Sequence, residues 1–239
     1  MRRHLLRVDK LSAVELNPGL RANDVVEIVH DLKNPLATIA LEMCLLADKL
    51  GDAAPLDMRT AVVRVQHNVA YLDRLVQDIL DSCALDAGSF ELHRRPSELL
   101  TLLEEVIERS VPTRDRARVY LDAPRGLTLN IDDLRIERVI ANLLQNALKY
   151  APRGSGVVIR LEIGERARIS VIDAGPGMTE EEMKRVFQKY WRTPDAVIHE
   201  GSGLGLYVAR RIVEAHGGSI AVESVRNQGS KFYFELPLR

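Results

Sequence analysis

Residues 29–36 have the sequence Val29-His30-Asp31-Leu32-Lys33-Asn34-Pro35-Leu36, and they lie within the pattern that decides the first half of the fold. Apolar residues here are spaced alternately by four and three: Val25, Val29, Leu32, Leu36, Ile39, Met43, Leu46 and Leu50. This heptad spacing predicts a helix with one apolar seam. His30 and Asn34 fall on the opposite face, one turn apart, with Asp31 to one side of them. We therefore expect His30 to be displayed to solvent.

A second heptad pattern follows after a short connection. The first helix is expected from about Asn23 to Leu50, and Gly51 and Pro55 indicate the turn that follows it. The second helix is expected to end near Gly88, and its seam consists of Val62, Val65, Val69, Leu72, Val76, Ile79 and Cys83. Two helices joined by so short a loop pack antiparallel, as a hairpin.

A single hairpin leaves several apolar side chains beside the seams with little to bury against: Val26, Leu41, Leu45, Val63, Leu75 and Leu80. We therefore predict a dimeric four-helix bundle, with docking of the hairpin onto the rest of the chain as the alternative. Cys44 and Cys83 fall at opposite ends of the hairpin, about 30 Å apart at ~1.5 Å per residue. That separation excludes an intrachain disulfide, so both are predicted to be buried, reduced thiols.

Beyond Gly88 the pattern changes from heptads to short strands alternating with helices, which indicates a domain boundary. The expected strands are 90–93, 119–121, 127–129, 157–163, 168–173, 219–225 and 231–236, and the expected helices are 97–110, 132–150, 179–188 and 204–216. Because the alternation lacks βαβ regularity, it predicts a two-layer α/β sandwich with a mixed sheet. The fold class is thus α+β, with a linker or truncated segment at 1–22, a hairpin domain at 23–88 and a sandwich domain at 89–239.

The composition is that of an ordinary globular protein. The 239 residues are 46% hydrophobic and 28% charged, and their formal net charge is -1. Such a balance gives no general attraction to nucleic acid or to anionic lipid. No run of about 18 apolar residues occurs, and charged residues follow the N-terminal Met1-Arg2-Arg3-His4. We therefore expect no membrane segment in this chain and a cytoplasmic location.

Amide side chains are paired on the helix that precedes Pro152. Asn142 and Asn146 are one turn apart on one face, and Lys149 and Tyr150 follow them. Amide oxygens suit a Mg2+ ion that keeps most of its waters and bridges phosphates, and Lys149 adds a point charge. By themselves, two asparagines on a helix are more often plain surface amides.

Two glycine-rich segments lie further along the chain. The sequence Asp173-Ala174-Gly175-Pro176-Gly177 follows a strand, so its carboxylate could accept from an exocyclic amine while Gly175 and Gly177 turn closely around a flat base. A plain Asp-Gly turn is the alternative. The sequence Gly201-Ser202-Gly203-Leu204-Gly205-Leu206 opens a helix and offers backbone N–H groups to phosphates, with tight packing as the alternative. It lacks both the P-loop signature and the preceding strand of a dinucleotide fold.

The segment Phe187-Gln188-Lys189-Tyr190-Trp191-Arg192 places aromatic rings and cations between these two glycine-rich segments. In this order, the pieces resemble the catalytic core of two-component sensor histidine kinases. Residues 30–36 resemble the H box of that family, 142–150 the N box, 173–177 the G1 box, 187–192 the F box and 201–206 the G2 box. The resemblance covers residues 23–239. Asp132 and Arg135 match a family pattern, whereas Arg138 and Trp191 depart from it.

The resemblance implies a dimerisation and histidine phosphotransfer hairpin, followed by an ATP-binding catalytic domain of the Bergerat type. In the ATP-binding domain, Asn146 would coordinate Mg2+ and Asp173 would hold adenine. Lys149 and the backbone of the G2 box would contact phosphates, and Lys189 or Arg192 would reach the γ-phosphate. The further nucleotide-binding residues implied are Asn142, Tyr150, Gly175, Gly177, Gly201, Gly203, Leu204 and Gly205. In the hairpin, His30 would be the nucleophile, Asp31 its base, and Asn34 the residue that aims water in a phosphatase reaction.

The function implied is that of a homodimeric, ATP-dependent protein-histidine kinase with ATP and Mg2+ as cofactors. It would phosphorylate His30 and pass the phosphoryl group to an aspartate in the receiver domain of a response regulator, which it would also dephosphorylate. Two alternatives remain open at this point: a dimeric scaffold that binds nucleotide without turnover, and a Bergerat-type ATPase that only hydrolyses ATP. The displayed His30, with Asp31 and Asn34 beside it, argues against the ATPase.

Overall fold

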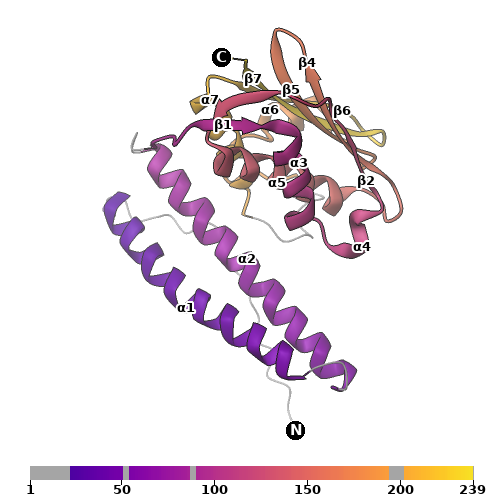
Figure 1. The fold of residues 1–239 in the computed structure, drawn as a ribbon. Coiled ribbons are helices and arrows are strands. Elements are labelled where there is room, and N and C mark those ends of the chain that lie inside the picture. The colour runs from indigo at the N-terminus through magenta and orange to yellow at the C-terminus, as the bar shows by residue number, and fades with distance from the viewer. Residues whose placement is uncertain (1–21, 51–53, 87–89, 194–201, 239) are drawn as a thin grey trace. The chain divides into compact units, whose positions relative to one another are not determined.

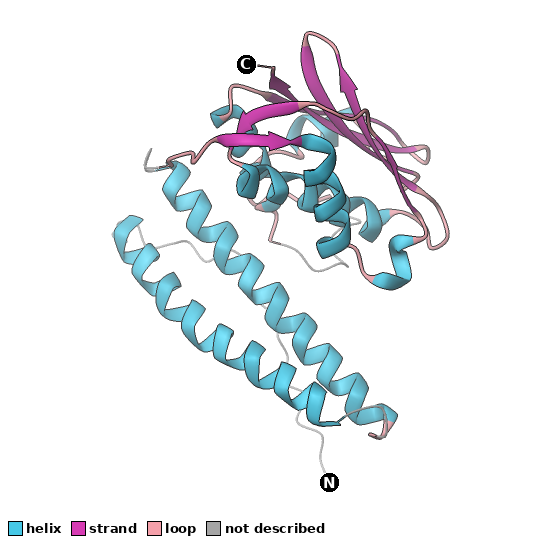
Figure 2. Cartoon of the chain, in the orientation of Figure 1, coloured by secondary structure: helices cyan, strands magenta, loops and turns pink. Residues whose placement is uncertain are grey.

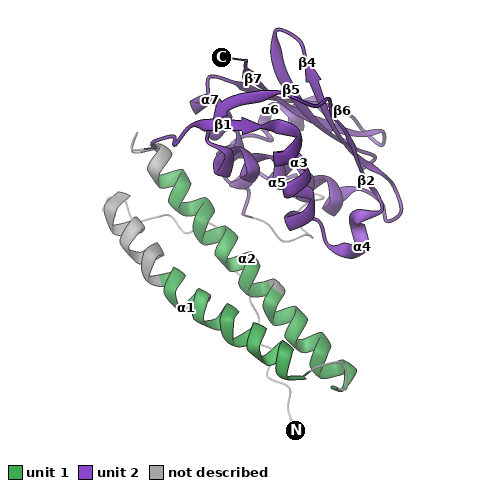
Figure 3. Cartoon of the chain, viewed as in Figure 1, with its two compact units in different colours: residues 1–87 green, residues 88–239 purple. Residues whose placement is uncertain are grey.

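The computed structural model describes residues 22–50, 54–86, 90–193 and 202–238, and at 22–31, 67 and 84–86 it describes the helical backbone alone. The chain forms two compact units, Met1–Ala87 and Gly88–Arg239 (Figure 3). In the described parts of both, no helix is long and apolar enough to span a bilayer. Each unit is described by itself.

Unit 1 is a hairpin of two helices, α1 (Ala22–Leu50) and α2 (Leu56–Asp86) (Figure 1). Two side-chain hydrogen bonds fix their antiparallel register. Lys33 Nζ donates to Gln77 Oε1 over 2.5 Å near one end, and Gln66 Nε2 donates to the Met43 carbonyl over 3.3 Å nearer the turn. The predicted hairpin is thus confirmed.

Only half of each predicted heptad seam is covered within the hairpin. On α2, Val62, Val69 and Val76 are buried, whereas Val65 and Leu72 stay 39% and 45% exposed. On α1 the exposed row consists of Leu32, Ile39 and Leu46, while Leu36, Met43 and Leu50 in the other row are intermediate in exposure. A heptad seam can pack both of its rows on one partner helix, but in this hairpin the second row of each helix stays exposed.

The prediction of buried thiols is wrong for Cys44, which is exposed on α1, and Cys83 is intermediate in exposure. Cys44 lies between Leu41 and Leu45, which are also exposed, at 60% and 45%. Neither Cys44 nor Cys83 forms a disulfide.

Unit 2 is the predicted two-layer α/β sandwich with a mixed sheet. Its strands are β1 (Arg95–Glu98), β2 (Val119–Asp122), β3 (Thr128–Ile131), β4 (Val157–Ile163), β5 (Arg166–Asp173), β6 (Ser219–Val225) and β7 (Gly229–Pro237). Its helices are α3 (Leu99–Ser110), α4 (Thr113–Arg116), α5 (Asp133–Tyr150), α6 (Glu180–Arg185) and α7 (Gly205–Ala215). The main sheet has the order β2-β4-β5-β7-β6, in which β2 and β4 are parallel and the other neighbours antiparallel. Strands β1 and β3 form a separate antiparallel pair.

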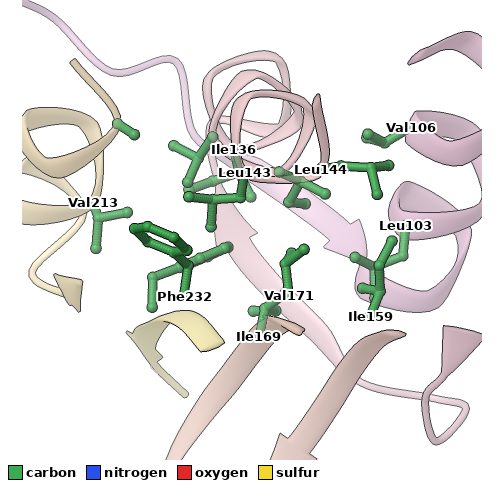
Figure 4. Close-up of a cluster of buried hydrophobic side chains, with 14 of the residues drawn as sticks. Leu103, Val106, Ile136, Leu143, Leu144, Ile159, Ile169, Val171, Val213 and Phe232 are labelled. Atoms are coloured by element: carbon green, nitrogen blue, oxygen red, sulfur yellow. The ribbon is translucent and has the colours of Figure 1, made fainter. Parts of the chain in front are cut away.

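Helices of unit 2 cover one face of the main sheet (Figure 2). Helix α5 packs on β4 and β5 and lies between α3 and α7. Its apolar face points into a core shared by all three helices and the sheet (Figure 4). That core includes Leu103, Val106, Ile136, Leu143, Leu144, Ile159, Ile169, Val171, Val213 and Phe232. The central helix of the layer is therefore the one that carries Asn142 and Asn146.

Two local expectations about unit 2 were wrong. The strand expected at 90–93 lies at 95–98 instead, where it pairs with β3 although Pro96 interrupts the strand pattern. Phe90 packs against the core, with the Arg135 guanidinium 4.5 Å from its ring centroid. The short helix α4 was not expected at all. Tertiary pairing decided the position of β1, because its sequence has little intrinsic strand preference.

Candidate functional site

Helix α5 presents the two asparagines beside its buried face. Leu143 and Ala147 on that helix are buried, while Asn142 and Asn146 are intermediate in exposure. The Asn146 side chain makes no hydrogen bond with any described residue. Its amide oxygen is therefore available to a ligand or a metal ion.

Asn142 lies against the start of helix α7, within the G2 box. A Cβ atom added at Gly205 would lie 2.5 Å from Asn142 Oδ1, so only glycine allows this approach. The Asn142 Nδ2 atom is buried and has no hydrogen-bond partner among the described residues. The N box and the G2 box are thus in direct contact through an amide whose donors are unused.

Asp173 ends strand β5 and is 9% exposed. The Gly175 N–H donates to its Oδ1 atom over 2.7 Å, and no other described residue hydrogen-bonds to its carboxylate. Burial raises the pKa of the Asp173 carboxyl, and the Gly175 hydrogen bond acts in the opposite direction. One oxygen of a nearly buried carboxylate is therefore left to accept from a ligand.

The two glycines of the G1 box are needed for different reasons. A Cβ atom at Gly175 would lie 2.6 Å from Asp173 Oδ1 and 3.3 Å from the Tyr150 carbonyl oxygen, so the loop passes close to the end of α5. Gly177 has a φ of 64°, and a Cβ atom there would lie 2.0 Å from the Val225 carbonyl oxygen. The loop could not adopt this path with larger residues.

The F box connects the core to the G2 box. Phe187 packs edge-to-face on Phe232, with the ring centroids 6.3 Å apart. Further along, the Tyr190 N–H donates to the Gly203 carbonyl over 3.0 Å. Lys189 Nζ lies 5.6 Å from the ring centroids of both Tyr190 and Tyr207. These contacts hold the F box against the first turn of α7.

Arg192 acts electrostatically on Tyr150, at the end of the N box. Burial raises the pKa of the Tyr150 phenol, and the positive charge of Arg192 lowers it in part. Lys149 Nζ lies 5.0 Å from the centroid of the same ring. Described residues of the G1, F and G2 boxes therefore lie along the C-terminal half of α5, which carries the N box.

The Leu204 N–H is already engaged, because it donates to Ser202 Oγ over 3.2 Å. A phosphate could use this N–H only after Ser202 turns away. Gly201 lies outside the described residues, as do the side chains of His30 and Asp31, although both stand on the backbone of α1. Asn34 is exposed on the same helix. His30, Asp31 and Asn34 thus belong to unit 1, and the expected nucleotide contacts belong to unit 2.

Sequence reasoning missed Ser224, which supports the G1 box from strand β6. Its Oγ accepts from the Met178 N–H over 2.9 Å and lies 2.7 Å from the Gly229 carbonyl oxygen, to which it donates. The Asn227 N–H donates to the Pro176 carbonyl over 2.7 Å. The sequence from 226 to 229, Arg-Asn-Gln-Gly, signals a tight turn, but no local pattern indicates that this turn reaches residues 176–178.

Comparison with known proteins identifies the class of the sandwich domain. Residues 131–239 match the family described as "Histidine kinase-, DNA gyrase B-, and HSP90-like ATPase". The chain is 33% identical over 219 residues to the adaptive-response sensory kinase SasA of Synechococcus sp. (strain JA-3-3Ab), which spans 88% of this chain and 58% of that protein. It is 29% identical to the sensor histidine kinase WalK of Bacillus subtilis (strain 168), over 92% of this chain and 37% of WalK.

Solved structures agree with these relatives. Full-length ShkA in complex with AMPPNP superposes with a TM-score of 0.70 and 27% identity, over 91% of this chain and 46% of ShkA. A nucleotide-free catalytic domain of the histidine kinase ThkA gives a TM-score of 0.52 and 30% identity, over 60% of this chain and 97% of that domain. The chain belongs to the sensor histidine kinase family. It spans 58% or less of the length of the two curated relatives named above.

Proposed function

We propose that this chain is an ATP-dependent protein-histidine kinase that phosphorylates His30 and passes the phosphoryl group to an aspartate in the receiver domain of a response regulator. One observation carries the proposal: three groups that suit a nucleotide lie along the C-terminal half of α5. They are a nearly buried Asp173 with a free carboxylate oxygen, an Asn146 amide without a hydrogen bond among the described residues, and the opening turn of α7. Residues 23–88 would be the phosphotransfer hairpin and residues 89–239 the ATP-binding domain.

Asp173 would select adenine. Its free oxygen would accept from an exocyclic amine, which adenine has and a keto-substituted purine lacks at the same position. Gly175 and Gly177 would let the loop pass along the flat base. The structure of ShkA is a complex with the ATP analogue AMPPNP, and this supports a nucleotide site in the shared domain.

The triphosphate would lie against the start of α7. The N–H groups of a helix's first turn have no partners within the helix and form its positive dipole end, so they suit phosphate oxygens. Gly203, Leu204 and Gly205 supply this backbone, and Lys149 supplies charge from α5. Lys189 and Arg192 would approach the γ-phosphate from the F box.

Mg2+ would be held by Asn146 together with the phosphates. In the described part of the chain no three His, Cys, Asp or Glu side chains group as a metal site, whereas the Asn146 amide is unbonded. A magnesium ion that keeps most of its waters and uses few protein ligands fits such a site. When bound, the ion would neutralise charge on the β- and γ-phosphates.

The reaction would take place at His30. A ring nitrogen of neutral His30 would form a bond to the γ-phosphorus, and the bond from that phosphorus to the β,γ-bridging oxygen would break, leaving ADP. Asp31 would accept a hydrogen bond from the other ring nitrogen and stabilise the imidazolium that forms. Asn34, one turn later, would aim a water at the aspartyl phosphate of the regulator.

The phosphatase role of Asn34 can be tested by substitution. Asn34→Ala should slow dephosphorylation of the phosphoregulator at least about tenfold and spare autophosphorylation.

Dimerisation would cover the exposed apolar rows of unit 1. Leu32, Ile39 and Leu46 on α1, with Val65 and Leu72 on α2, repeat at heptad spacing and remain exposed in the described hairpin. A second hairpin could bury both rows in a four-helix bundle. The partner proposed for this surface is therefore another copy of the chain.

Incubation with γ-labelled ATP and Mg2+ tests the proposed function. We expect label on the protein that survives base and is lost in acid, because a phosphorus–nitrogen bond at histidine is acid-labile. Adding receiver domains should then move the label to one of them. Release of free phosphate without labelled protein would indicate an ATPase, and ATP binding with neither product would indicate a scaffold.

A further inference from the structure

Tyr190 has an unusual backbone conformation for its residue type. Its φ is 63°, in the left-handed region, where bulky residues are rare because Cβ crowds the following carbonyl. Its side chain does not explain this conformation, since Tyr190 remains 57% exposed. Contacts of the Tyr190 main chain explain its conformation instead.

The Tyr190 main chain touches that of the G2 box. Its N–H donates to the Gly203 carbonyl over 3.0 Å. Gly203 has a φ of 71°, and a Cβ atom there would lie 2.7 Å from Tyr190 C and 2.9 Å from Tyr190 Cα. The main chains of these two left-handed residues are thus in direct contact, and they lie too close together for a side chain at Gly203.

This contact determines the orientation of one peptide group. In a trans peptide the C=O and the following N–H point in opposite directions. Because Tyr190 binds the Gly203 carbonyl, the Leu204 N–H of the same peptide points away from Tyr190, where Ser202 Oγ accepts from it. Leu204 is the N-cap of α7, so the same peptide also sets how that helix begins.

Two contacts made by the preceding residues of the F box hold Tyr190 in place. Phe187 packs on Phe232 of the core three residues before it. Lys189 Nζ lies at equal distances, 5.6 Å, from the rings of Tyr190 and of Tyr207 in the first turn of α7. The Tyr190 backbone is therefore braced between the core and the helix whose start it orients.

We infer that Tyr190 is a positioning residue whose left-handed backbone, rather than its ring, orients the Gly203–Leu204 peptide for phosphate binding. The inference rests on the proposed function, since it assumes that the start of α7 receives the triphosphate. It goes further by assigning a role to the Tyr190 main chain, which acts through its contact with Gly203.

Substitutions that differ in left-handed preference separate the backbone from the ring. Glycine, alanine and valine all remove the ring, but glycine adopts positive φ freely, alanine less readily and β-branched valine least. In the full chain with Mg2+, we expect Tyr190→Gly to bind ATP within about twofold of the parent. Tyr190→Ala should bind a few-fold more weakly, and Tyr190→Val on the order of tenfold more weakly.

Adenosine affinity separates a loss of phosphate binding from a general structural defect, because such a defect would weaken adenosine binding as well. It lacks phosphates, so its affinity for all three variants should stay within about twofold of the parent chain in titration calorimetry. Tyr120→Val is the matched control. Tyr120 has the same exposed fraction, 57%, but lies on strand β2, where valine is well tolerated, so ATP affinity should not change.

Three results would overturn the inference. Equal losses for glycine and valine would assign the effect to the ring. Parallel losses of ATP and adenosine affinity would indicate damage to the whole domain. If Tyr190→Val fails to fold, the ATP affinities of Tyr190→Gly and Tyr190→Ala are compared in its place. A parent chain that binds neither ligand would overturn the proposed function together with this inference, whereas the other results leave the proposed function standing.

Discussion

The ring of His216 accepts a hydrogen bond from the backbone N–H of Asp132 over 3.1 Å, and so joins the end of helix α7 to the start of helix α5. His216 is 2% exposed, and its Nδ1 donates to the Ile212 carbonyl over 2.8 Å. Asp132 in turn caps α5 by accepting from the Arg135 N–H over 3.1 Å. The two helices that carry the N box and the G2 box are therefore tied together through one neutral imidazole.

This tie predicts a pH dependence of stability. Burial lowers the pKa of His216 below its usual 6.5; the Ile212 hydrogen bond and Asp132 act against this, and Arg94 reinforces it. The unfolded chain therefore takes up a proton that the folded chain refuses, and stability falls as the pH drops below about 6.5. For this one group, the free energy of unfolding should fall by up to about 1.4 kcal/mol per pH unit.

Denaturant unfolding between pH 7.5 and 5, followed by the fluorescence of the single Trp191 in unit 2, measures this slope. In His216→Leu the dependence of the unfolding free energy on pH should be shallower by up to about 1.4 kcal/mol per pH unit, and the overall stability should be lower. His93→Gln, which replaces an exposed histidine of the same unit, is the matched control. An unchanged slope in His216→Leu would show that this histidine is not held neutral.

Asp173→Asn should lose selectivity for ATP over GTP. The amide replaces an acceptor-only group that is nearly buried, and one of its orientations presents an N–H group to the amine of adenine. We expect ATP affinity to fall by on the order of a hundredfold without loss of thermal stability, because an amide is cheaper to bury than a charge. Calorimetric titration with both nucleotides measures the ratio, and an unaltered ratio would remove Asp173 from base recognition.

Asn146→Ala should weaken the effect of Mg2+ on ATP binding. Since this amide has no hydrogen bond to lose within the described protein, the fold should be unaffected. ATP affinity in EDTA should match that of the parent, while the gain on adding Mg2+ should fall by about tenfold. Gln145→Ala, one position earlier on α5, is the matched control. A full Mg2+ response in Asn146→Ala would place the metal ion elsewhere.

Ser224→Ala should loosen the G1 box from strand β6. The change removes the acceptor of the Met178 N–H and the donor to the Gly229 carbonyl, so the free energy of unfolding should fall by about 1–3 kcal/mol. Adenosine affinity should fall as well, since the loop that follows Asp173 loses its support. Ser219→Ala at the exposed start of the same strand should change neither quantity. Adenosine affinity equal to that of the parent would limit Ser224 to a role in stability.

Much of the fold follows from periodicity, since α1, α2, α5 and α7 lie where apolar spacing and capping residues place them. Strand β1 could not be predicted, because its register depends on β3, about 30 residues further along the chain. The heptad seams were predicted as single faces. The split between buried Val69 and exposed Leu72 appears only once the position of the second helix is known.

The candidate site could be predicted as residue types but not as contacts. The sequence indicated Asn142 and Gly205 separately, but it could not indicate that they touch, because 62 intervening residues fold between them. The left-handed backbone of Tyr190 has no signal in its residue type, which disfavours that conformation. Ser224 was missed because its partners at 178 and 229 come close to it only when the sheet forms.

Labelling of His30→Gln tests the central claim most directly. The full chain and the variant would be incubated with γ-labelled ATP and Mg2+, with ATP affinity measured in parallel. We predict acid-labile, base-stable label on the parent chain, none on the variant, and ATP affinities within about threefold, because His30 and the nucleotide site belong to different units. Acid-labile label on His30→Gln at the parent level would contradict the account.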